Sequence, residues 1–116
     1  MIRKIVSMVL VSAAFSGCFY DKEELLYPTA KDCSTVDAHF ATQVQPLIQT
    51  RCAIAGCHDV ASGNVGGPFT NYTQIKNKAG SIKTQVNSGA MPQGSTLTVE
   101  QIQLISCWVD SGAPNN

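Results

Sequence analysis

The sequence predicts a small all-α domain. Two observations favour this class: apolar residues at helical spacing in residues 36–50, and a capped amphipathic segment that begins after Thr98. Glycine- and proline-rich stretches separate the two segments and indicate loops. A chain of 116 residues holds at most one small domain, and a disulfide or other covalent link would support its modest core.

The first predicted helix lies within residues 36–50. Phe40, Val44, Leu47 and Ile48 fall at positions i, i+4, i+7 and i+8, so they share one helix face. Pro46 interrupts the pattern because proline lacks a backbone N–H. We therefore expect either one bent helix or a short turn followed by a helix that opens near Pro46.

Two short helices are expected in the middle of the chain. Residues 61–68 are rich in glycine and predict an irregular loop. Asn71 could then cap a helix over residues 72–78, and Ser81 could cap another over residues 82–87.

The last helix is the most clearly marked. Thr98 and Gln101 have the spacing of a capping box, and Leu97 and Ile102 that of a hydrophobic staple. One broad apolar arc follows at 100 degrees per residue, made of Ile102, Leu104, Ile105, Trp108 and Val109. Gly112 is expected to end this helix.

Residues 1–17 have the features of an export signal. Arg3 and Lys4 precede an apolar stretch, residues 5–15, that is shorter than the about 20 residues needed to span a bilayer. Residues 15–18 (Phe-Ser-Gly-Cys) resemble a bacterial lipobox, so Cys18 would become the lipidated first residue. An ordinary signal peptide cut near Cys18 is the alternative. Either way the domain folds outside the cytoplasm, and a lipid at Cys18 would hold it on a membrane of the cell envelope, facing the periplasm or the cell surface.

Residues 18–32 are expected to form a tether, and residues 33–116 the domain. The acidic run at residues 21–24 is either a soluble spacer or a surface-export signal. Once Arg3 and Lys4 are removed, six basic residues stand against eight acidic ones, a net charge of −2. No basic cluster is present, which excludes a nucleic-acid-binding protein.

The run from Cys52 to His58 (Cys-Ala-Ile-Ala-Gly-Cys-His) resembles a covalent haem-attachment site. Four residues separate the cysteines where the usual signature has two. In this interpretation Cys52 and Cys57 form thioethers with the haem vinyl groups, and His58 is the proximal iron ligand. Gly56 would accommodate the backbone of the longer spacer.

Met91 is the candidate for the other axial ligand. It stands before Pro92 in an irregular loop with glycines on both sides. A thioether sulfur suits haem iron and would complete His/Met coordination. A lone methionine is more often a core or loop residue, but the haem motif upstream favours a ligand.

Cys33 and Cys107 remain once Cys18, Cys52 and Cys57 are assigned. In an oxidising compartment, two remaining cysteines favour a disulfide over two buried thiols. Cys107 lies just past the edge of the apolar arc of the last helix, which suits a bridge to a neighbouring segment. The bond would close a loop of about 75 residues, worth roughly 4 kcal/mol in chain-entropy models.

The motifs together resemble those of small class I c-type cytochromes, particularly the lipid-anchored bacterial type with one haem. The likeness covers nearly all of the chain from residue 36 onward. It is carried by Phe40, Val44, Pro46, Leu47, Cys57, His58, Tyr72, Ile75, Met91, Pro92, Leu97, Thr98, Gln101, Ile102 and residues 108–114.

The resemblance implies a cytochrome c-like fold, with about four short helices around one covalent haem c. The first and last helices would cross, and Phe40 and Trp108 are assigned to that crossing and to the haem pocket. Pro68 is a weaker pocket candidate, as the carbonyl that orients the imidazole of His58. The implied function is one-electron transfer between redox partner proteins, without a small-molecule substrate or enzymatic activity.

Three other classes of protein stay open. A zinc module would use Cys52, Cys57, His58 and His39, although adjacent Cys57 and His58 do not easily face one tetrahedral ion. A structural lipoprotein would pair Cys52 with Cys57. A haem enzyme resembling a small peroxidase would need a distal acid–base group, which the sequence near Met91 does not offer. His39, otherwise a solvated helix residue, is the alternative sixth ligand.

Overall fold

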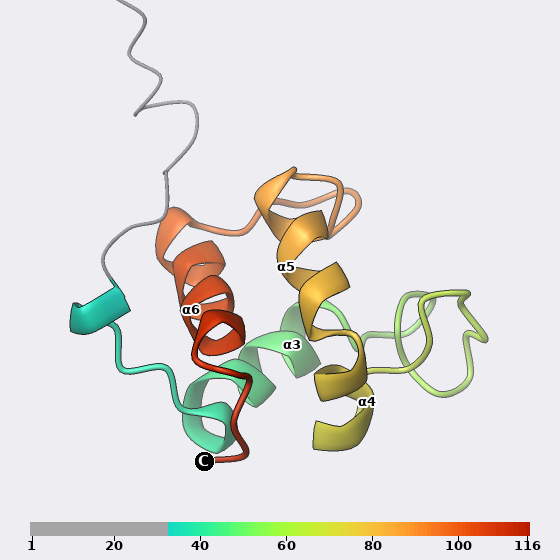
Figure 1. Cartoon of the computed structure of the whole chain (residues 1–116). Coiled ribbons are helices and arrows are strands. Elements are labelled where there is room, and N and C mark those ends of the chain that lie inside the picture. Colours follow the sequence, from blue (N-terminus) through green and yellow to red (C-terminus); the bar gives the residue numbers. More distant parts are fainter. Residues whose placement is uncertain (1–32) are drawn as a thin grey trace, which may run out of the picture.

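A computed structural model describes residues 33–116 as an all-α domain (Figure 1). Its four α-helices are α3 (Gln45–Arg51), α4 (Tyr72–Asn77), α5 (Ala79–Asn87) and α6 (Val99–Asp110), and no strand occurs in these residues. Two short helical turns, η2 (Cys33–Thr35) and η3 (Phe40–Val44), precede α3. The predicted class, all-α with the first and last helices in contact, is confirmed.

The expected signal peptide, the lipidation site Cys18 and the tether fall in residues 1–32, outside the described residues. Within residues 33–116, every helix is too short or too polar to cross a bilayer.

The first helical segment widens into a π-helical turn before Pro46. In η3 the N–H of Val44 donates to the carbonyl of His39 at 3.1 Å, and the N–H of Gln45 donates to the carbonyl of Phe40. Pro46 lies in the first turn of α3, where its missing N–H costs little. The segment is therefore continuous, and the change from π to α geometry is where it accommodates the proline.

Of the two middle helices, α4 has the N-cap that the sequence predicts, and α5 does not. Asn71 caps α4 as predicted, since its Oδ1 accepts the N–H of Gln74 at 3.0 Å. The assignment of Ser81 as an N-cap is wrong, because α5 already begins at Ala79. Lys78 ends α4 and starts α5, so no connecting loop is left for a separate cap.

Helix α6 has the predicted ends. The N–H of Gln101 donates to the hydroxyl of Thr98, and the side chain of Gln101 accepts the N–H of Thr98, which completes the capping box. After the helix, Gly112 adopts a φ of +95°, a conformation that favours glycine.

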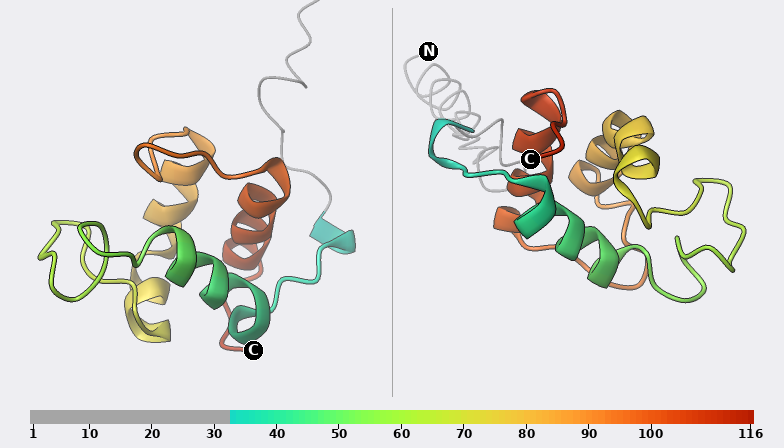
Figure 2. Two further views of the ribbon diagram at one scale, coloured as in Figure 1. Left: turned by 180° about the vertical axis from the view of Figure 1, so that it is seen from behind. Right: turned by 90° about the horizontal axis from the view of Figure 1, so that it is seen from below.

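The core lies where η3, α4 and α6 meet. The rings of Phe40 and Trp108 are 5.4 Å apart between centroids, and those of Phe40 and Tyr72 are 5.0 Å apart. The largest fully buried side chains are Trp108, Phe40, Ile48, Ile75, Ile105 and Val44. Packing of these aromatic rings joins the first helical segment to the last one, which lies beside it in Figure 2.

The residues after α6 form hydrogen bonds that hold the first helical segment against α6. The N–H of Phe40 donates to Oδ1 of Asn116, and the N–H of Ala41 donates to its main-chain carbonyl, both at 2.8 Å. Asn116 thus satisfies free donors at the start of η3. The indole N–H of Trp108 donates to the carbonyl of Pro114 at 2.9 Å, which holds the segment against the core.

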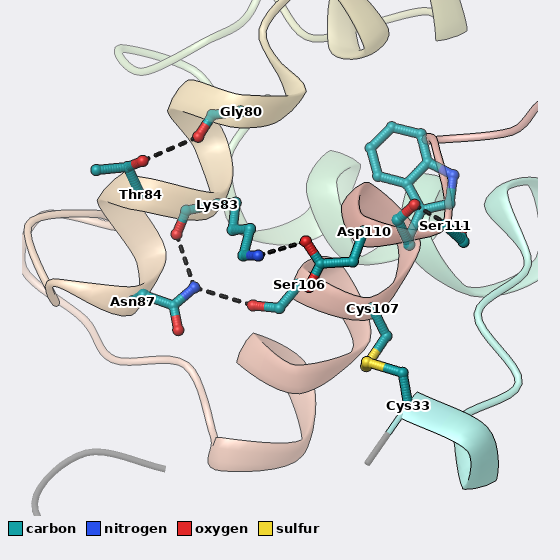
Figure 3. A network of polar contacts seen from close by, with 10 residues as sticks. Cys33, Gly80, Lys83, Thr84, Asn87, Ser106, Cys107, Asp110 and Ser111 are labelled. Carbon is teal, nitrogen blue, oxygen red and sulfur yellow. Dashed lines mark hydrogen bonds and ion pairs between the residues drawn. A yellow bond between two sulfur atoms is a disulfide. The ribbon is translucent and has the colours of Figure 1, made fainter. Parts of the chain in front are cut away.

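Covalent and polar links hold the outer face of α6 (Figure 3). The expected disulfide joins Cys33 in η2 to Cys107, with 5.5 Å between the Cα atoms. On the side toward α5, Lys83 pairs with Asp110. Beside that pair, Nδ2 of Asn87 donates to Oγ of Ser106 at 2.9 Å. The disulfide is the covalent link among these contacts, and it joins the exposed Cys33 to the buried Cys107.

Replacement of Cys33 should measure the disulfide's contribution to stability. Cys33 is exposed, so Cys33→Ser removes the bond without opening a cavity at that residue. Since the bond spans 74 residues, we expect a loss of about 2–4 kcal/mol in the free energy of unfolding, measured by urea titration. A reductant should lower the stability of the wild type to that of the variant. Equal stabilities without reductant would contradict the prediction.

Candidate haem site

The segment after α3 folds back on itself and brings the two cysteines and the histidine into one turn. The N–H of His58 donates to the carbonyl of Cys52 at 3.0 Å, and the N–H of Cys57 donates to that of Ile54 at 3.0 Å. Gly56 has a φ of +81°, in the left-handed region, as expected for the residue that lets the spacer turn. The four-residue spacer therefore closes into a loop whose ends, Cys52 and His58, are hydrogen-bonded.

The imidazole of His58 is oriented by a carbonyl group. Its Nδ1 lies 2.9 Å from the carbonyl oxygen of Gly67. Since a carbonyl oxygen only accepts hydrogen bonds, Nδ1 carries the proton of this bond. In the neutral ring Nε2 then keeps its lone pair, the form that binds a metal.

Two neighbours fix the plane of the His58 ring. The ring of Phe69 stacks on it, with centroids 4.3 Å apart and 22° between the planes. A Cβ on Gly66 would lie 2.7 Å from Cε1 of His58, so the backbone approaches the imidazole more closely than any larger residue permits. The imidazole ring of His58 therefore lies between the buried side chain of Phe69 and the backbone of Gly66.

The sequence predicted that the carbonyl of Pro68 orients the His58 imidazole. In the structure this carbonyl belongs to the preceding residue, Gly67. A tight turn is the reason. The N–H of Gly67 donates to the carbonyl of Asn64 at 2.8 Å, and its φ of +84° aims the carbonyl at the imidazole. Pro68 follows this turn half-buried and leads into Phe69.

Both cysteines of the loop are free thiols and half-buried. Burial raises the pKa of the Cys52 thiol, the Arg51 guanidinium opposes this shift, and the nearby Cys57 adds to it. Neither is in a disulfide, so both can react.

Arg51 joins this loop to the one that carries Met91. Its Nη2 donates to the carbonyl of Thr96 at 2.6 Å, across 45 residues of sequence. Its Nε is buried and has no partner. The residue before Cys52 therefore holds the end of the loop between α5 and α6.

Met91 lies half-buried in that loop. Its N–H donates to the carbonyl of Gln85 at 3.2 Å, which anchors the loop to the last turn of α5. Gly89 and Gly94 on either side have φ values of +72° and +74°. The structure thus groups Cys52, Cys57 and His58 in one loop and Met91 in a second loop, with Arg51 between them.

The remaining candidates lie elsewhere. Phe40 and Trp108 are fully buried in the helix crossing. His39 is exposed, and its Nε2 lies 2.7 Å from the carboxylate of Asp37. Among residues 33–116, no three His, Cys, Asp or Glu side chains converge on a point that could hold a metal ion.

The residues of the Cys52–His58 loop fit haem c. Two free thiols flank a short turn, and the next residue presents an imidazole whose Nδ1 is already occupied. Sequence reasoning missed three residues of this arrangement, Phe69, Gly66 and Arg51. The glycine-rich composition of residues 61–68 was the available signal for Gly66, because glycine is required where backbone approaches a ring closely.

No family model, no curated protein and no solved structure matches this chain. The functional argument therefore depends on the residues and their geometry.

Substitution of Gly66 should displace His58. We expect Gly66→Ala to destabilise the folded chain by about 1–3 kcal/mol in urea unfolding, because the new methyl group overlaps the imidazole. For the cytochrome proposed below, the haem absorption spectrum should change as well, because the His58 ring moves. Gly80→Ala is the matched control, because Gly80 is exposed on α5 and nothing lies within 4 Å of its Cβ position. A spectrum and stability unchanged by Gly66→Ala would contradict the account.

Proposed function

We propose that this chain is a small lipid-anchored class I c-type cytochrome that carries single electrons in the bacterial cell envelope. One observation carries the proposal. His58 directly follows Cys57, stands in a turn closed on Cys52, and has its Nδ1 hydrogen-bonded to a carbonyl, which leaves Nε2 for iron.

The chain's own residues have distinct roles in this proposal. Cys52 and Cys57 would hold haem c as thioethers, and Nε2 of His58 would be the proximal ligand. Bound haem would supply the one-electron chemistry of its iron. The bond from His58 to Gly67 prevents rotation of the imidazole and increases its basicity toward iron.

The Met91 sulfur would be the ligand on the opposite face. Its loop is fixed at Gln85 and, through Arg51, at Thr96. A loop fixed at both ends supports a ligand position that changes little between oxidation states. Thioether ligation favours the reduced form and raises the reduction potential.

A cytochrome c-like arrangement of the helices is part of the proposal. Contact between η3 and α6 through Phe40 and Trp108 supports it, as does the end of α3 beside Cys52. A rigid domain around the cofactor serves electron transfer, because little has to reorganise. The lipid on Cys18 would restrict the carrier to a membrane surface where redox partners are also held.

The first test asks whether haem is bound covalently. When the chain is produced with a haem-maturation system, we expect haem to stay with the polypeptide on a denaturing gel stained for haem. The double variant Cys52→Ala/Cys57→Ala should lose this signal, because both thioethers are gone. Cys33→Ser should retain it. A wild-type chain without bound haem would contradict the proposal and favour the structural lipoprotein with Cys52 paired to Cys57.

The second test concerns the sixth ligand. Met91 is the one methionine left after removal of residues 1–17. We expect Met91→Leu to abolish the sulfur-to-ferric-iron charge-transfer band and to lower the reduction potential, while haem stays attached. His39→Ala is the control and should leave the band unchanged. A band that persists in Met91→Leu would refute the assignment. A wild type that lacks the band, and whose haem spectrum changes in His39→Ala but not in Met91→Leu, would identify His39 as the ligand.

A further inference from the structure

We propose that Arg51 is a positioning residue for the redox site: its side chain keeps the Met91 loop closed, and its charge favours the reduced state. The Met91 loop is the connection between α5 and α6, residues 88–98. This inference rests on the proposed electron-transfer function, and it assigns a redox role to a residue outside the Cys52–His58 motif.

Arg51 supplies the hydrogen bond that holds the second half of the Met91 loop. Its Nη2 donates to the carbonyl of Thr96 at 2.6 Å. Within residues 33–116, this is the one hydrogen bond made by residues 92–96. Loss of this bond would leave the chain between Met91 and Leu97, which packs against the core, without a polar anchor.

The first half of the Met91 loop is anchored independently, to the end of α5. The N–H of Gly89 donates to the carbonyl of Val86 at 3.3 Å, and the N–H of Met91 donates to that of Gln85 at 3.2 Å. Replacement of Arg51 leaves both of these bonds in place. The loop would then be held on one side only, and opening of the other side would let the Met91 sulfur move away from a bound iron.

The charge of Arg51 is not cancelled by its bond to Thr96, because the acceptor is a neutral carbonyl group. The Nε of Arg51 is buried and has no partner. Buried donors without a partner are unfavourable and rare in folded proteins, so the position of this guanidinium indicates a role beyond packing.

The charge of Arg51 acts at a residue that would carry haem. Burial raises the pKa of the Cys52 thiol, and the Arg51 guanidinium opposes that rise. A positive charge that favours a thiolate at this point disfavours the additional positive charge of ferric iron. Arg51 would therefore raise the reduction potential, while the exchange itself stays a one-electron step that takes no proton from this side chain.

A purely structural role for Arg51 is the alternative. Arg51 ends α3, where a cation interacts favourably with the helix dipole. In that case its replacement would lower the stability of the domain and change neither the opening of the Met91 loop nor the reduction potential. The two explanations therefore differ in ligand exchange and in potential.

Displacement of Met91 by free imidazole measures how often the loop opens. An added ligand reaches ferric iron only when the sulfur has left, so its apparent affinity rises with the open fraction. We expect imidazole to bind about tenfold more tightly to haem-loaded Arg51→Met than to the wild type, in a titration followed by the charge-transfer band. The reduction potential of Arg51→Met should be lower than that of the wild type.

Lys76→Met is the matched control. The Nζ of Lys76 also donates to main-chain carbonyls, those of Gly112 and Ala113, which lie outside the Met91 loop. Its imidazole affinity should equal that of the wild type, and its potential should change less than that of Arg51→Met. Arg51→Lys keeps the charge and a donor, so both of its values should lie closer to the wild type than those of Arg51→Met.

The outcomes separate this inference from the proposed function. A wild type without covalent haem, or without the charge-transfer band, refutes the proposed haem coordination and this inference with it. When the band is present, equal imidazole affinities in the wild type and Arg51→Met overturn the role of Arg51 alone, and so do equal values in Arg51→Lys and Arg51→Met. Urea unfolding shows whether Arg51→Met is folded. If it is not, Arg51→Gln, whose shorter side chain loses the same bond, replaces it with the same expected result.

Discussion

The packing of Phe40 against Trp108 is the contact on which the rest of the structure depends. It joins the first helical segment to the last, and Asn116 closes the same crossing through two hydrogen bonds to η3. Helix α3 then ends at Cys52, and α6 begins where the Met91 loop ends. One buried aromatic pair thus sets the positions from which both loops of the candidate site start, and Arg51 links them directly.

The arrangement around His58 is the structural support for the proposed role of this residue as an iron ligand. A histidine that only filled space would not need a carbonyl on Nδ1, a stacked Phe69 and a glycine against its edge. These three neighbours define the ring's tautomer, plane and position while Nε2 keeps its lone pair. In the proposed function, haem c would use these three neighbours of His58 together with the two free cysteines in the same turn.

Sequence patterns predicted the parts of the fold that depend on local chemistry. The Asn71 cap and the capping box at Thr98 follow from residue type and spacing. The disulfide of Cys33 and Cys107 was predicted by a different route, from the cysteines left once the other three were assigned. Two contacts between distant segments were not predictable, because Asn116 at the start of η3 and Arg51 at Thr96 depend on how the helices pack. The shift from Pro68 to Gly67 has the same origin, since it depends on a turn whose geometry the composition of the loop does not specify.

Covalent attachment of haem at Cys52 and Cys57 is the central claim, and mass spectrometry of the denatured, reduced and alkylated chain tests it most directly. The account predicts the polypeptide plus one haem, located on the peptide that contains residues 52–58, with Cys33 and Cys107 alkylated and Cys52 and Cys57 protected. A chain of polypeptide mass alone, in which Cys52 and Cys57 are both alkylated, would contradict it.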